Sequence, residues 1–123
     1  MKMLRNCTAM IVMAIIVVAL SSCGRLESYG QAISNNKITT VGNILRSPDD
    51  YEGKFVTISG VIDTECPTGC WFNLKDTTGL IYVDLGAYAF AIPQKVGRKA
   101  TVEGKIVIEE NEVVMMGRGV QVR

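Results

Sequence analysis

The sequence has 123 residues, of which 48% are apolar and 20% are charged, and its formal net charge is +1. A chain of this length forms one small domain and leaves no room for a two-domain enzyme. The sequence contains no histidine. Because histidine is the commonest general base and metal ligand, its absence excludes serine-triad, His-zinc and His-haem sites in their usual forms.

The N-terminus has the pattern of a secretory signal, predicted here to span residues 1–22. Lys2 and Arg5 precede an uncharged apolar run over residues 9–20, and small residues follow that run. The run is shorter than the roughly 20 residues that a transmembrane helix needs. Residues 20–23, Leu-Ser-Ser-Cys, resemble the bacterial lipobox, in which cleavage before the cysteine frees an N-terminus that carries diacylglycerol and an N-acyl chain.

Cys23 is therefore the expected lipidation site, and it would attach the protein to a membrane of the cell envelope. An uncleaved anchor and a soluble exported form are the alternatives. Gly24 stands where an inner-membrane retention signal has Asp, so the resemblance favours the outer membrane of a Gram-negative cell, with the domain facing the periplasm. Loss of Lys2 and Arg5 with the signal leaves 13 − 2 = 11 basic side chains against 12 acidic ones, a net charge of about −1.

The segment that follows is polar and shows little periodicity. We expect residues 23–38 to form the lipidated cysteine and a flexible tether, and residues 39–123 to form the domain. A weak N-cap and a few apolar positions predict one or two helical turns that end before Pro48. From Phe55 to Glu65, apolar residues alternate with polar ones, which predicts a strand whose even positions face the core.

Residues 66–70, Cys-Pro-Thr-Gly-Cys, match a three-residue hairpin loop. Pro67 suits the first turn position, and Gly69 suits the left-handed position that closes the turn. In this register Cys66 lies opposite Cys70. The register extends to four further pairs, namely Thr64 with Phe72 and Ile62 with Leu74 in the core, and Glu65 with Trp71 and Asp63 with Asn73 on the outer face.

Three further strands follow. A four-residue loop at 76–79 predicts Phe72 opposite Val83 and Leu74 opposite Ile81 inside, with Trp71 opposite Asp84 and Asn73 opposite Tyr82 outside. Residues 86–97 predict a short helical or irregular crossing. Residues 99–109 alternate again, with Glu103 on the outer face, and a turn at 110–111 leads into the last strand, 113–122.

These five strands fit an all-β, five-stranded Greek-key barrel of the OB-fold type. A short helical turn precedes the first strand, and a short irregular or helical crossing joins strands 3 and 4. Glycines within the strands would allow them to bend around the barrel. A generic small barrel or an SH3-like fold is the alternative.

Residues 40–110 resemble small bacterial OB-fold lipoproteins and periplasmic proteins that form domain families of unknown function. The resemblance rests on Tyr-Glu-Gly-Lys at 51–54, on the Gly-Cys-Trp hairpin at 69–71 and on Phe-x-Ile-Pro at 90–93. It implies the fold and the location, and it implies no established activity.

Cys66 and Cys70 allow two interpretations. As a disulfide, which we favour, they close a short loop, and the chain-entropy argument gives a stabilisation of about 2 kcal/mol. As thiolates, they could bind a soft metal such as Cu(I), with Met115 or Met116 as a thioether ligand. A catalytic redox pair is disfavoured, because the cysteines lack the two-residue spacing at a helix N-terminus that lowers a thiol pKa.

Strand parity gathers polar and aromatic side chains on the outer face of strands 2 and 3, where OB-folds bind their ligands. The predicted ligand face consists of Trp71, Asn73, Tyr82, Asp84, Glu65 and Asp63. Its carboxylates repel phosphates, so nucleic acid is not an expected partner. The face suits a small cationic or polar ligand, a sugar or an envelope protein. Alternatively, the tryptophan only covers the hairpin and packs on the tether.

We expect no cofactor and no catalytic residues, because the sequence has no nucleophile motif or phosphate loop and its carboxylates lie at solvent-facing positions. The sequence thus predicts a non-catalytic, lipid-anchored binding or interaction module of the envelope. The alternative is a copper-binding or redox-handling envelope protein that uses Cys66 and Cys70. Oligonucleotide binding ranks third.

Overall fold

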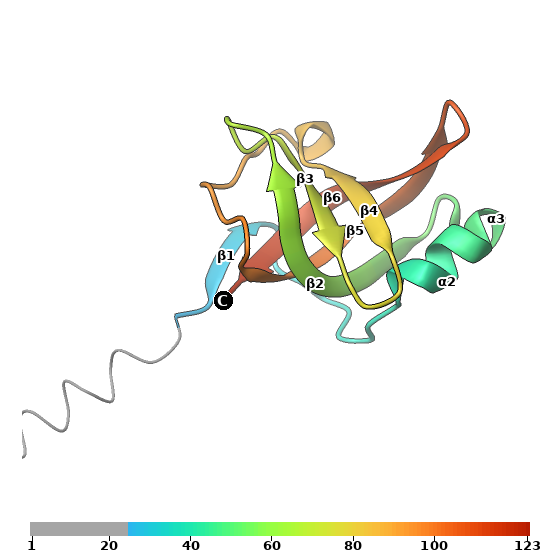
Figure 1. Cartoon of the computed structure of the whole chain (residues 1–123), viewed down its shortest axis with the longest axis horizontal. Coiled ribbons are helices and arrows are strands. Elements are labelled where there is room, and N and C mark those ends of the chain that lie inside the picture. The colour runs from blue at the N-terminus through green and yellow to red at the C-terminus, as the bar shows by residue number, and fades with distance from the viewer. Residues whose placement is uncertain (1–24) are drawn as a thin grey trace, which may run out of the picture.

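The computed structural model describes residues 25–123, so the predicted signal peptide and Cys23 lie outside the described residues. Figure 1 shows the chain as a small barrel with two short helices at one end. In chain order the elements are β1 (Glu27–Gly30), α2 (Val41–Arg46), α3 (Pro48–Tyr51), β2 (Phe55–Glu65), β3 (Trp71–Lys75), β4 (Leu80–Asp84), the 3-10 turn η1 (Gly86–Tyr88), β5 (Lys99–Glu109) and β6 (Glu112–Val122). Within residues 25–123, no helix is long and apolar enough to span a membrane.

Strands β2 to β6 close into a barrel. The sheet order is β1-β6-β4-β3-β2-β5, and an additional pairing between β5 and β6 closes it. β4 and β6 run parallel, whereas the other neighbouring strands are antiparallel. This mixed five-stranded barrel, with a short helix before its first strand, confirms the predicted OB-fold.

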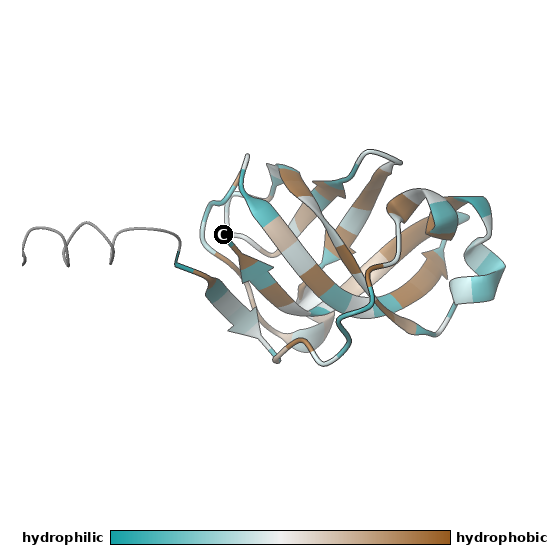
Figure 2. Ribbon diagram, turned by 90° about the horizontal axis from the view of Figure 1, so that it is seen from below, coloured by the Kyte–Doolittle hydropathy of each residue, from teal (hydrophilic) through white to brown (hydrophobic). Residues whose placement is uncertain are grey.

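The core fills the barrel interior, and its apolar side chains mostly recur with a period of two along the strands, which Figure 2 shows as alternating bands. Thr57 and Glu103 are buried as well, outside this alternation. Ile58, Ile62, Phe72 and Leu74 are fully buried, as the alternation predicts. Full burial of side chains of this size contributes about 2 kcal/mol each. α2 adds Val41 and Ile44 to the same core.

The predicted helical turns before Pro48 are confirmed as α2, and a second short helix follows them. Thr40 caps α2 by accepting a hydrogen bond from the backbone N–H of Asn43, and the helix ends before Pro48. Pro48 then begins this second short helix, α3, because proline is well suited to the first position of a helix. The β3–β4 loop holds α2 in place, since the carboxylate of Asp76 accepts from the N–H of Val41 at 2.9 Å.

The expectation of a flexible tether over residues 23–38 is wrong for its described part. Glu27 to Gly30 form strand β1, which pairs with β6 from Val122 to Gly119. β6 would otherwise expose unpaired backbone groups along this edge, and β1 satisfies them. The folded part of the chain therefore begins at least as early as Glu27.

The placement of Glu103 on an exposed outer face is also wrong. Glu103 is only 1% exposed, because residues 31–39 cross over this part of the barrel. The Ser34 hydroxyl donates to its carboxylate at 2.9 Å, the Ser34 and Asn35 amides donate at 3.2 Å, and Arg118 forms an ion pair with it at 3.4 Å. The N-terminal segment and the barrel thus share a buried polar cluster, which we call the Glu103 cluster.

The predicted register of the β2–β3 hairpin is confirmed at Ile62 and Leu74 and is wrong beyond them. Thr64 lies opposite Asn73, and Glu65 lies opposite Phe72, because a bulge between Ile62 and Thr64 adds one residue to β2. One extra residue reverses which face each later side chain occupies. The register between β3 and β4 is confirmed in full.

The hairpin loop is correspondingly longer than predicted. The N–H of Cys66 donates to the carbonyl of Trp71 at 3.0 Å, so Cys66 lies opposite Trp71 and not opposite Cys70. The predicted turn is present within this longer loop, with the Gly69 N–H donating to the Cys66 carbonyl and Gly69 at a φ of +74°.

Candidate functional site

The outer face of β3 and β4 carries a stacked aromatic pair. The rings of Trp71 and Tyr82 lie 5.4 Å apart at an interplanar angle of 29°. Trp71 is half-buried, and Tyr82 is 37% exposed. Burial, followed by the nearby charges of Asp84 and Cys70, raises the pKa of Tyr82 above its ordinary value. The pair therefore offers a neutral aromatic surface to solvent.

Four of the six residues predicted for the ligand face are brought together. Asp84 lies opposite Trp71, and Asn73 lies opposite Tyr82, as the sequence predicted. The carboxylate of Asp84 accepts from the N–H of Gly86 at 2.8 Å. The Asn73 side chain donates to the hydroxyl of Thr64 at 2.7 Å, so neighbouring groups fix both side chains.

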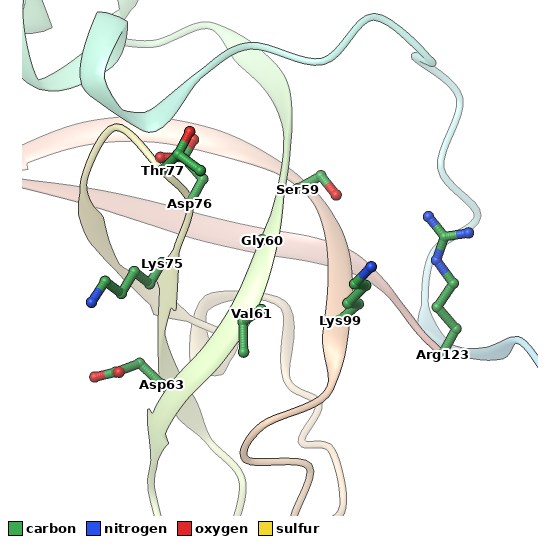
Figure 3. Close-up of a pocket in the computed structure, with 9 residues that line it drawn as sticks. All are labelled: Ser59, Gly60, Val61, Asp63, Lys75, Asp76, Thr77, Lys99 and Arg123. Carbon is green, nitrogen blue, oxygen red and sulfur yellow. The ribbon is translucent and has the colours of Figure 1, made fainter.

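Glu65 and Asp63 do not join this face. Glu65 lies opposite the buried Phe72, and one of its carboxylate oxygens accepts from the Lys95 N–H. The other oxygen is buried without a hydrogen-bond partner among the described residues. Asp63 lies at the bulge and lines a different pocket together with Lys75 (Figure 3). The bulge in β2 explains why Glu65 and Asp63 were both placed wrongly, and no residue pattern in the sequence indicates it.

The ligand face has an acidic margin that the sequence pattern did not predict. β6 runs beside β4, with Val114 opposite Tyr82, and this pairing brings the β5–β6 turn to the aromatic pair. An open pocket of about 780 Å³ results, and its lining comprises Asn73, Tyr82, Val114, Glu109, Glu110 and Glu112. These residues include three carboxylates and no Lys or Arg. In OB-folds the loop between the fourth and fifth barrel strands, here the β5–β6 turn, usually lies at the ligand face. This general rule could have predicted the contact.

Cys66 and Cys70 meet in the β2–β3 loop. Their sulfur atoms lie 2.9 Å apart, and the Thr68 hydroxyl lies 3.1 Å from the Cys66 sulfur. Hydrogen bonds from Cys70 and then from Thr68 lower the pKa of the Cys66 thiol to about 6. Ile92 supports the loop, because its N–H donates to the Gly69 carbonyl at 3.1 Å.

The structure separates the two methionines considered as metal ligands. Met115 is fully buried in the barrel core. Met116 is the next residue along β6 and therefore points to the other face, where it lies opposite Asp84. Within residues 25–123, no group of three or more His, Cys, Asp or Glu side chains could hold a metal ion.

A second open pocket, of about 590 Å³, lies on the outer side of β2 (Figure 3). Its lining comprises Ser59, Gly60, Val61, Asp63, Lys75, Asp76, Thr77, Lys99 and Arg123. Three of these side chains are cationic, so this pocket differs in charge from the acidic margin beside Tyr82.

No family model and no curated protein sequence matches this chain. Among solved structures, the hypothetical protein YgiW from E. coli is similar, with a TM-score of 0.57 and 18% identity over 77% of this chain and 99% of YgiW. Asparaginyl-tRNA synthetase from Pyrococcus horikoshii has a TM-score of 0.57 and 15% identity over 70% of this chain and 23% of the synthetase. At such identities the likeness concerns the fold, and it supports an OB-fold, an architecture that commonly serves as a binding module.

Proposed function

We propose that this protein is a non-catalytic OB-fold binding module, anchored in the cell envelope through lipidated Cys23, whose β3–β4 face captures a cationic group of a small ligand or a protein partner. The lipobox resemblance of residues 20–23 supports the anchor and the envelope location. The aromatic pair of Trp71 and Tyr82 beside a cluster of carboxylates is the observation that carries the binding function.

The chemistry of this face favours a cation. An ammonium or guanidinium group over an aromatic ring is attracted by about 0.5–2 kcal/mol, and tryptophan is the best ring for this contact. Asp84 lies directly opposite Trp71, and Glu109, Glu110 and Glu112 surround the pocket beside Tyr82. These charges raise the local concentration of cations and repel phosphate groups. A nucleic-acid ligand would instead require a basic groove along the stacking aromatics.

Binding can be followed directly, because Trp71 is the only tryptophan of the chain. The probes are an arginine-rich peptide and a glutamate-rich peptide of the same length, titrated against the mature lipoprotein in detergent. We expect the basic peptide alone to change the Trp71 fluorescence, with an affinity that falls as salt is raised. Equal responses to both peptides, or none to the basic one, would contradict the proposal.

Matched substitutions locate the binding site. Trp71→Ala should weaken capture of the basic peptide at least tenfold, measured by calorimetry because this variant lacks the fluorophore. Glu109→Gln combined with Glu112→Gln should weaken it severalfold. The control is Asp49→Asn combined with Glu52→Gln, which removes the same charge at α3 and should leave the affinity unchanged.

The sulfur pair supports a second candidate, a copper-binding or redox-handling function. The 2.9 Å separation and the lowered pKa of Cys66 favour thiolate chemistry at neutral pH. Formation of a disulfide would remove two protons and two electrons, which a disulfide-donating oxidant of the envelope would accept. Mass spectrometry of the native protein separates the two states. A loss of two hydrogens without metal indicates the disulfide, whereas copper bound to the reduced protein indicates the metal site.

A further inference from the structure

The short distance between Cys23 and the barrel restricts how the domain can lie on a membrane. Because β1 begins at Glu27, only residues 24–26 separate Cys23 from the sheet. An extended chain spans at most about 3.6 Å per residue, so the first sheet residue lies within roughly 15 Å of the anchored cysteine. The end of the barrel that carries Glu27 must therefore face the membrane if Cys23 is lipidated as proposed.

That end of the barrel is basic. Glu27 lies opposite Val122 on β6, and Val122 lies opposite Ala100 on β5, so the end of β6 and the start of β5 lie beside it. Arg98 donates to the Arg123 carbonyl at 3.1 Å, and the Arg123 N–H donates to the Lys99 carbonyl at 3.0 Å. The cationic residues gathered here are Arg25, Lys95, Arg98, Lys99 and Arg123.

The carboxylates near this end are few. Lys95 forms an ion pair with Glu27 at 2.8 Å, so this acid is neutralised. Glu65 also reaches this region, where one of its carboxylate oxygens accepts from the Lys95 N–H. Asp76 is engaged by the N–H groups of Val41, Thr78 and Gly79, and Asp63 lies beside Lys75 in the pocket of Figure 3. Arg25, Arg98, Lys99 and Arg123 are exposed.

Apolar side chains are exposed among these cations. Leu26 is 57% exposed and Val96 is 55% exposed, and both adjoin the basic residues in sequence. Val61 is 39% exposed and lies opposite Lys99 on the neighbouring strand. Apolar side chains flanked by lysine and arginine suit the boundary between lipid headgroups and acyl chains.

At the far end of the barrel, carboxylates outnumber cations. The turn between β5 and β6 carries Glu109, Glu110 and Glu112, and the first turn of α3 contains Asp49 and Asp50. Figure 1 shows this turn and α3 on the side away from β1 and the C-terminus. The near-neutral total charge therefore conceals a separation of charge along the barrel.

We propose that the surface formed by Arg25, Leu26, Val96, Arg98, Lys99 and Arg123 rests on an anionic phospholipid surface and orients the barrel. This inference rests on the proposed anchoring at Cys23. The acyl chains supply the attachment, and the basic surface fixes which end faces the headgroups. The acidic β5–β6 turn then points away from the membrane, toward partners in the surrounding compartment.

The test uses the mature lipoprotein reconstituted into two kinds of vesicle, one of phosphatidylcholine alone and one with equal parts of phosphatidylcholine and phosphatidylglycerol. Exposed lysines are acetylated, and mass spectrometry gives the modification rate at each site. We expect the rate at Lys99 to fall severalfold in the anionic vesicles. The rate at Lys54, at the other end of β2, should stay the same.

Charge-reversed variants test the surface. Arg98→Glu combined with Arg123→Glu should abolish the protection of Lys99. Lys37→Glu combined with Arg46→Glu changes the charge equally at exposed positions near α2, and should keep that protection. Melting curves confirm that both variants are folded, and single substitutions replace any double variant that is not.

The proposed lipid anchor at Cys23 and the proposed membrane-facing surface can be contradicted independently of each other. Retention on neutral vesicles and acyl chains on Cys23, seen by mass spectrometry, report the anchor alone. A lipidated protein whose Lys99 reacts equally in both vesicles would overturn the inference and leave the anchor intact. Binding to anionic vesicles alone, with Lys99 protected and Cys23 unmodified, would support the surface and overturn the anchor. An unlipidated protein that binds neither vesicle would overturn both.

Discussion

The Glu103 cluster and the Trp71–Tyr82 face show two uses of polar and aromatic side chains in one small barrel. Glu103 is almost completely buried, and hydrogen bonds from Ser34 and Asn35 and an ion pair with Arg118 satisfy its carboxylate. The aromatic face is partly exposed, and its nearby carboxylates line an open pocket. A buried carboxylate whose hydrogen bonds are all satisfied contributes to stability. Exposed aromatic rings and carboxylates can instead contact a ligand.

The largest expected effect comes from removing the centre of the buried cluster. Glu103→Ala leaves the Arg118 guanidinium and the Ser34 and Asn35 amides without their acceptor, and should lower the free energy of unfolding by about 3 kcal/mol. Chemical denaturation measures this change. Glu109→Ala, at the exposed turn, should change it by less than about 0.5 kcal/mol. Similar losses in the two variants would remove the distinction between the regions.

The second-largest effect is expected from acid, which should lower the free energy of unfolding through Glu103 and Asp76. Burial alone would raise the pKa of Glu103, but hydrogen bonds from Ser34 and the charge of Arg118 outweigh it and hold the pKa below the ordinary value. The pKa of Asp76 is likewise lowered, because hydrogen bonds from Thr78 and Val41 outweigh burial.

The sign of the pH dependence follows from these lowered values. The unfolded chain takes up protons first as pH falls, so this stabilisation is complete above the ordinary carboxyl pKa, near 4, and is lost below it. Each group contributes a slope of at most about 1.4 kcal/mol per pH unit. Denaturation midpoints between pH 6 and 3 measure the slope, and Glu103→Gln should make it shallower. An unchanged slope in that variant would contradict the assignment.

A smaller effect is expected at the sulfur pair, and it concerns reactivity more than stability. In the reduced protein, Cys66 should be alkylated with a midpoint near pH 6, because Cys70 and Thr68 stabilise its thiolate. Cys70→Ala and, to a lesser extent, Thr68→Val should move this midpoint toward the ordinary thiol value. Iodoacetamide labelling at a series of pH values, read by mass spectrometry, measures the shift. The two variants should melt close to the unsubstituted reduced protein.

Only a modest change in stability is expected at the ligand face itself. Trp71→Ala removes a half-exposed stacking contact with Tyr82 and should lower the free energy of unfolding by only about 1 kcal/mol. Trp71→Phe keeps an aromatic ring at this position and should cost less. Thermal melting of the two variants checks the order. A loss comparable to that of Glu103→Ala would show that Trp71 mainly supports the fold.

The strands and their pairing were predictable wherever the period of two was uninterrupted. Trp71 and Asp84, and Asn73 and Tyr82, are paired as predicted because a turn of defined length fixes the register between β3 and β4. Glu65 and Asp63 were misplaced because the bulge in β2 inserts one residue without a distinctive residue type. The acidic margin was missed because Glu109, Glu110 and Glu112 reach Tyr82 only through the parallel pairing of β4 and β6.

The sequence by itself determined the barrel strands, the turn chemistry and the short helix before the first strand, since alternation, turn residues and caps are local properties of the chain. Only the tertiary structure decided that residues 27–30 form a strand, that Glu103 is buried, and that cations and carboxylates separate to opposite ends. These features depend on which distant segments meet when the barrel closes. The physical reason is that burial and electrostatic fields are sums over the whole fold, whereas propensity acts within a few neighbouring residues.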